Sequence, residues 1–160
     1  MKVYFDHEKL EVYQRALAFC GWAGDLINEI AGKAAVKDQL DRASTSIPLN
    51  IAEGNGKFSN ADRSRFLEMA RGSALECSGA LDVLVARKQT STDRIADGKE
   101  QLVSIVKMLM GLLKRFSSRA DFLREDETGY GLMASVDQDQ DQDHEQEQVG
   151  ANQRERPNGA

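Results

Sequence analysis

The chain has 160 residues, of which 41% are hydrophobic. This is enough for one domain whose core needs neither disulfides nor metals for stability. The formal charge of -5 comes entirely from residues 134–160, which contain seven acidic and two basic side chains, so residues 1–133 carry 19 of each sign. Because residues 1–133 carry no net charge, the protein does not belong to the strongly basic class that binds nucleic acid without selectivity.

The sequence also argues against export and membrane insertion. The first twenty residues are too rich in charge for the apolar segment of a signal peptide, and no apolar run reaches membrane-spanning length. Cys20 and Cys77 lie within apolar helical stripes, where free cysteines are typically buried. We therefore expect a cytoplasmic protein without disulfides or membrane contact.

The first predicted helix spans residues 8–31 and carries two apolar stripes with alternating spacings of three and four residues, which is the pattern of a helix-bundle seam. The stripe that we take as the seam comprises Leu10, Tyr13, Leu17, Cys20, Gly24, Ile27 and Ala31. The second stripe lies about 110° further round the helix. Its members are Val12, Ala16, Phe19, Ala23, Leu26 and Ile30.

Trp22 lies on the remaining, otherwise polar side of the same helix. One interpretation is that Trp22 is exposed and, together with the wide apolar arc, marks an interface with a partner subunit. The other interpretation is that Trp22 covers a loop of its own subunit.

A second helix is predicted over residues 36–53, with Pro48 inside it and Gly54 at its end. The third begins after an N-cap at Ser59 and runs to about residue 88.

The third helix contains Gly72 and Gly79, which are seven residues apart and share one face. Because glycine lowers helix propensity, we expect another backbone to approach closely at this face. A fourth amphipathic helix follows and runs to residue 123.

Four amphipathic helices with short loops predict an all-α fold, an antiparallel up-down-up-down four-helix bundle over residues 1–133. Residues 134–160 alternate Asp or Glu with Gln and have little to bury, so we expect a disordered acidic tail. Such a tail would compete with phosphate for basic side chains.

The residue pattern indicates neither a catalytic site nor a metal site. A carboxylate-bridged metal pair inside a bundle requires Glu-x-x-His motifs, whereas His7 precedes the first helix and His144 lies in the tail. Two cysteines far apart are too few for a zinc site, and no histidine is placed to activate a nucleophile. We expect no enzyme activity, no cofactor, no metal and no small-molecule substrate.

One polar stripe lies opposite the core stripe of the second helix and comprises Arg42, Ser46, Asn50 and Glu53. Glu76 shares a face of the third helix with Gly72. These residues either form a structural network between the two helices, such as Arg42 with Glu76, or they form a partner surface. The structural interpretation is favoured because mixed charges on neighbouring helices usually pair.

Basic residues gather near the end of the fourth helix, where they either complement the helix dipole or bind RNA phosphates. They are Lys107, Lys114, Arg115 and Arg119.

An ordered set of segments resembles a known family. These segments are residues 10–16 (LEVYQRA), 38–43 (DQLDRA), 46–57 (SIPLNIAEGNGK) and positions within 65–76. Over about residues 5–120 the chain resembles the four-helix-bundle proteins encoded in intervening sequences of bacterial 23S ribosomal RNA genes. Those proteins are related to the accessory variability determinant of diversity-generating retroelements, which binds a reverse transcriptase and RNA.

The resemblance implies a bacterial, non-enzymatic bundle that assembles into a ring-shaped homopentamer. Two hypotheses for its function remain open. The first is an oligomeric protein that engages structured RNA or an RNA-handling enzyme such as a reverse transcriptase. The second is a homo-oligomeric adaptor without a nucleic-acid partner.

Overall fold

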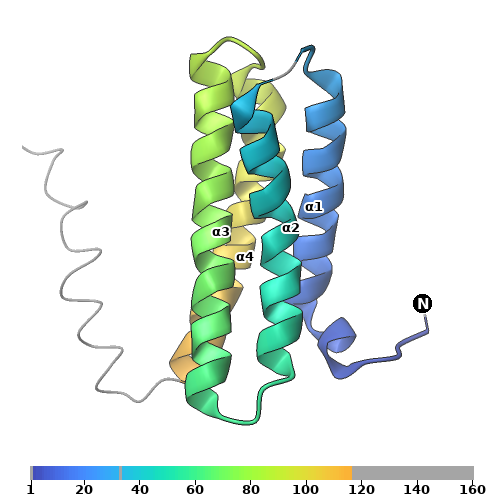
Figure 1. Cartoon of the computed structure of the whole chain (residues 1–160), viewed down its shortest axis with the longest axis vertical. Helices are drawn as coiled ribbons and strands as arrows, with labels where there is room; N and C mark the ends of the chain where they lie inside the picture. The colour runs from blue at the N-terminus through green and yellow to red at the C-terminus, as the bar shows by residue number, and fades with distance from the viewer. Residues whose placement is uncertain (1, 33, 117–160) are drawn as a thin grey trace, which may run out of the picture. The chain divides into compact units, whose positions relative to one another are not determined.

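The computed structural model describes residues 2–32 and 34–116, and in this part of the chain one short 3-10 helix precedes four α-helices without any strand. The helices alternate in direction and pack side by side, as Figure 1 shows. The prediction of an all-α, up-down-up-down four-helix bundle is therefore confirmed. The elements are η1 (Asp6–Lys9), α1 (Glu11–Glu29), α2 (Ala35–Asn55), α3 (Asn60–Ala86) and α4 (Thr92–Phe116).

Local sequence explains where α3 begins. The Ser59 hydroxyl accepts a hydrogen bond from the Asp62 N–H at 3.0 Å and donates one to its carboxylate at 2.7 Å, so the predicted N-cap of α3 is confirmed. Helix α2 continues through Pro48, as expected. The predicted end of the fourth helix at residue 123 lies outside the described residues. The same is true of the boundary at residue 133 and of the acidic tail.

The bundle interior consists of apolar side chains from all four helices. The largest fully buried ones are Phe19, Leu26, Leu40, Ile47, Ile51, Leu81, Leu84, Ile105 and Leu109. The predicted core stripe of α2 is confirmed by the burial of Leu40, Ile47 and Ile51. Within the described residues no helix is long and apolar enough to cross a membrane.

Helix α1 is rotated relative to the prediction. The stripe of Val12, Ala16 and Phe19 is buried, whereas Leu17 of the expected seam is 44% exposed. The expected seam lies on the α2 side of α1, where Cys20 Sγ is 4.0 Å from Thr45 Oγ1. The choice of seam was wrong because both stripes have the same period and similar apolarity, so periodicity alone does not select between them.

Trp22 decides this rotation. Its six-membered ring packs directly over Gly98 of α4, so closely that a Cβ added at Gly98 would lie 2.1 Å from Trp22 Cη2. The Trp22 ring stacks on Phe19 with 5.7 Å between the centroids, and the Arg94 guanidinium lies 5.4 Å from the indole. Arg94 also donates two hydrogen bonds to the Glu29 carboxylate at 2.7 and 2.8 Å, which lowers the pKa of Glu29.

The expectation that Trp22 stands exposed is therefore wrong, and so is the alternative that it covers a loop. Trp22 is half-buried between α1 and α4 of one subunit. The reason for placing this residue at a subunit interface is thereby removed.

The contact between Trp22 and Gly98 leads to a stability prediction. Gly98→Ala should lower the free energy of unfolding by about 1–3 kcal/mol, because the new methyl group displaces an indole that is held from two sides. Urea denaturation followed by circular dichroism measures this change.

Gly111→Ala is the matched control. Gly111 lies in the same helix and has open space at its Cβ position, so alanine there should stabilise the protein by about 0.5–1 kcal/mol. In a Trp22→Leu background the cost of Gly98→Ala should shrink or vanish. An equal cost in both backgrounds would show that the indole is not what excludes a side chain at this position.

Candidate functional site

Polar side chains between α2 and α3 form the first candidate site. Arg42 donates a hydrogen bond to the Gln39 side-chain oxygen, and the Gln39 amide nitrogen donates to the Glu76 carboxylate. Gln39 thus stands between the two residues that the sequence analysis proposed as an ion pair. The predicted direct contact between Arg42 and Glu76 is therefore wrong. Gln39 is half-buried on the α3 side of α2 and forms a hydrogen bond with each of them.

A second, less exposed set of hydrogen bonds is centred on Ser46. The Asn50 amide donates to the Ser46 carbonyl and to its hydroxyl, both at 2.9 Å, and the Ser73 hydroxyl lies 2.9 Å from the Ser46 hydroxyl. Ser46 therefore connects α2 to α3. Sequence reasoning did not single out Ser73 as a site residue. The available signal was its position one turn before Glu76 on the same side of α3.

The other predicted members of this site are not part of the network. Glu53 pairs with Lys57 of its own chain segment at 3.1 Å. Gly54 is buried, and a Cβ at this position would lie 3.0 Å from the Phe66 Cβ and 3.4 Å from the Arg63 carbonyl oxygen. Gly54 therefore permits the close approach of α2 to α3 at this end of the bundle.

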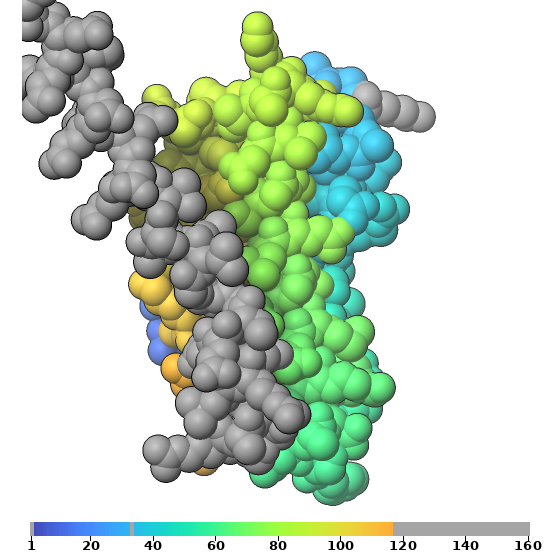
Figure 2. Space-filling view, turned by 90° about the vertical axis from the view of Figure 1, so that its left-hand side faces the viewer, coloured from blue at the N-terminus to red at the C-terminus, as the bar shows by residue number. Residues whose placement is uncertain are grey.

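The outer face of α3 is open. Among the described residues, no atom outside the neighbouring backbone of α3 lies within 4 Å of a Cβ built at Gly72 or at Gly79, so no other described helix makes the close approach expected at these glycines. Leu75 and Val83 flank them and are 48% and 41% exposed. In Figure 2, α3 runs along the molecule with α2 at its side, and in the part that is visible no other helix covers its outer face.

The second candidate site is the basic cluster on α4. Lys107 and Arg115 are exposed, and neither has an ion-pair partner among the described residues. Lys114 is also exposed and has a contact within the structure, whereas Arg119 lies outside the described residues.

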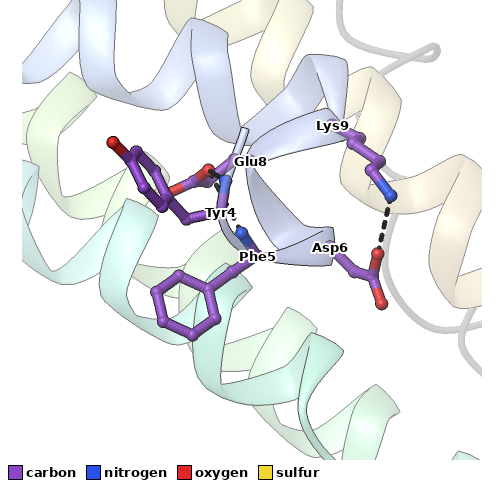
Figure 3. A network of polar contacts seen from close by, with 5 residues as sticks. All are labelled: Tyr4, Phe5, Asp6, Glu8 and Lys9. Atoms are coloured by element: carbon purple, nitrogen blue, oxygen red, sulfur yellow. Dashed lines mark hydrogen bonds and ion pairs between the residues drawn. The ribbon is translucent and has the colours of Figure 1, made fainter. Parts of the chain in front are cut away.

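Three acidic side chains near the start of the chain, at the same end of the bundle, have local partners. Asp6 pairs with Lys9 at 2.8 Å, and Glu11 of α1 pairs with Arg15 at 2.9 Å. The Glu8 carboxylate accepts hydrogen bonds from the backbone N–H groups of Tyr4 and Phe5 at 2.6 and 3.2 Å, as Figure 3 shows, and these bonds lower the pKa of Glu8. None of these three carboxylates pairs with Lys107 or Arg115.

The described residues offer little for covalent or metal chemistry. They contain no group of three or more His, Cys, Asp or Glu side chains that could hold a metal ion. Burial raises the pKa of the Cys77 thiol to about 12, so this thiol is protonated at neutral pH and is a poor nucleophile. The arrangement is suited to binding through exposed groups.

Comparison with known proteins agrees with this architecture. The family model of the 23S rRNA-intervening sequence protein matches residues 8–111, a stretch that includes all of α1, α2 and α3 and most of α4. The chain belongs to this family. The family resemblance read from the sequence is confirmed, whereas the relation to retroelement accessory proteins stays a prediction.

A solved structure from the S23 ribosomal protein family has the same fold. It is the crystal structure of a protein with unknown function from the S23 ribosomal protein family of Bacteroides thetaiotaomicron. The TM-score is 0.61 at 24% sequence identity, over 64% of this chain and 98% of that one. No curated protein matches the sequence.

The two polar networks should differ in their contribution to stability. Ser46→Ala should lower the free energy of unfolding by about 1 kcal/mol, because it removes the acceptor shared by Asn50 and Ser73 in a partly buried position. Glu76→Ala should cost less than about 0.5 kcal/mol, because Glu76 is exposed and water replaces it as the partner of Gln39. Thermal and urea unfolding of both variants measure the difference. The reverse order of the two costs would contradict this assignment.

Proposed function

We propose that this member of the 23S rRNA-intervening sequence protein family is a non-enzymatic protein that self-associates and binds structured RNA through one end of its bundle. The observation that carries the proposal is that Arg115 at this end of the bundle, and Lys107 eight residues before it on α4, are exposed and have no ion-pair partner among the described residues. A neutral body binds phosphate only if its charges are sorted in space, and in this proposal Lys107 and Arg115 supply the positive site.

The contact with RNA is expected to be weak for a single subunit. Each subunit offers about four basic side chains, and the affinity of so few phosphate contacts falls steeply with salt. Repetition of the same end in an oligomer raises avidity without any new type of contact. Self-association and RNA binding therefore support each other in this proposal.

The outer face of α3 is the surface that we propose for self-association. Gly72 and Gly79 expose backbone, and Leu75 and Val83 beside them expose apolar side chains. Small residues allow close helix packing, and apolar groups around them gain from burial. A second copy is a suitable occupant, and the family resemblance predicts five copies in a ring.

One observation favours assembly without RNA as the second candidate function. Toward the other end of the bundle opposite charges are interleaved, with Arg94 paired to Glu29 at 2.7 Å and Lys99 paired to Asp82 at 2.7 Å. Such a surface has no concentrated positive field. If the basic end likewise has no concentrated positive field in solution, the protein is an adaptor that self-associates without binding RNA.

The assembly proposal is tested by the mass of the protein in solution. Light scattering of the full chain should give a mass near five times 17.7 kDa. Leu75→Asp should shift the mass toward one subunit, because a carboxylate loses its hydration when it is buried in a contact between two copies.

The matched control is Val103→Asp, which places the same charge at a 52% exposed residue on the outer side of α4. This variant should retain the mass of the unmodified protein. A monomer at micromolar concentration would refute self-association, and loss of assembly in both variants would refute the α3 face as the interface.

The RNA proposal is tested by removing charge without changing size. The double variant Lys107→Gln and Arg115→Gln should weaken binding of a labelled RNA hairpin about fivefold or more at about 50 mM salt, and the unmodified protein should lose affinity between about 50 and 200 mM. Fluorescence anisotropy measures both effects.

The control removes the same charge at the other end of the bundle, with Arg87→Gln and Lys88→Gln at the end of α3. Binding should then change less than about twofold. If the unmodified chain does not bind the hairpin even at low salt, the RNA proposal fails and the assembly reading stands.

A further inference from the structure

A cavity of about 230 Å³ lies at the basic end of the bundle, where the end of α2, the start of α3 and the end of α4 meet near Leu10. Its walls combine apolar side chains with Asn55, Arg63, Arg115 and Phe116. The volume lies below the roughly 300–1,000 Å³ of typical small-molecule sites, so the cavity suits one small flat group.

The cavity contains a stacking surface. The Arg63 guanidinium lies 5.5 Å from the centroid of the Phe116 ring, within the range of a cation–π contact. Arg63 is held in place because its Nε donates a hydrogen bond to the Lys57 carbonyl at 2.7 Å. The guanidinium makes no other hydrogen bond among the described residues, so its terminal nitrogens remain available to a ligand.

Two further groups supply polar recognition. Asn55 brings an amide that both donates and accepts, which matches the edge of a nucleobase. Arg115 is exposed and without an ion-pair partner in the described part of the chain, which suits a phosphate at the mouth of the cavity. Apolar walls beside these groups favour a ring over a hydrated ion.

We propose that this cavity accepts one unstacked base of a single-stranded RNA loop or end. In this assignment the base stacks against Phe116 and Arg63, the Asn55 amide contacts its edge, and Arg115 binds an adjacent phosphate. Unpaired bases are the part of RNA that proteins recognise by stacking on aromatic rings and guanidinium planes. The assignment rests on the proposed RNA binding and adds a preference for unpaired nucleotides.

The test compares two RNA probes on the full chain. One is a hairpin with an unpaired loop, and the other is a blunt duplex with the same stem. Phe116→Leu and Arg63→Lys leave the net charge unchanged, yet each should weaken hairpin binding about fivefold, because each removes part of the surface on which the base stacks. Duplex binding should change less than about twofold.

Matched controls lie just outside the cavity. Phe58→Leu removes a fully exposed ring from the α2–α3 loop, and Arg65→Lys alters a guanidinium that lies over Phe66, 5.1 Å from the ring centroid. Both should bind both probes within about twofold of the unmodified chain. Urea unfolding checks that Phe116→Leu is folded, and Arg63→Lys carries the test if it is not.

The outcomes separate this inference from the function on which it rests. Equal weakening of hairpin and duplex, similar effects of the control variants, or no effect of the cavity variants would overturn the assignment. In those cases the unmodified chain still binds RNA, and the loss caused by Lys107→Gln with Arg115→Gln persists. Failure of the unmodified chain to bind either probe would overturn RNA binding itself and this inference with it.

Discussion

The contact between the Trp22 indole and the bare backbone at Gly98 sets the rotation of α1 in the bundle. The Trp22 ring occupies the space that a side chain at position 98 would need, so the two helices close-pack at this point because residue 98 is glycine. Once the indole lies there, Phe19 turns into the core and Leu17 turns out of it. Arg94 and Glu29 then close over the indole from α4 and α1.

This rotation determines which surfaces the molecule presents. Trp22 packs within its own chain, so the apolar groups that we propose for self-association lie elsewhere, on the outer face of α3 around Gly72 and Gly79. Helix α2 covers one flank of α3, and its hydrogen bonds through Ser46 and Gln39 fix the relation between the two helices. The open face of α3 is therefore held in a defined orientation, which favours specific packing over indiscriminate association.

Function in this fold is expected to come from its surfaces. The core is filled by aliphatic and aromatic side chains, and the thiol of Cys77 is kept protonated by its burial. The basic end combines exposed cations with a cavity that contains a guanidinium stacked on a ring. In the proposed function, affinity comes from phosphate binding and selectivity from base stacking, and neither requires a catalytic group.

The sequence by itself determined the helical fold, the number of helices and the approximate position of most helix ends. Period and capping are local properties: the apolar period of α2 and the Ser59 cap depend only on residues a few positions apart. The family was also readable, because its motif occupies one contiguous stretch around residues 46–57.

Only the tertiary structure decided which stripe of α1 is buried, what Trp22 contacts and how Arg42 reaches Glu76. Each of these depends on a residue from a distant part of the chain: Gly98 is 76 positions from Trp22, and Gln39 joins Glu76 across 37 positions. The cavity has the same origin, because its walls come from residues near the ends of separate helices. Sequence periodicity specifies the faces of each helix, whereas the fit between particular side chains of different helices selects how those faces meet.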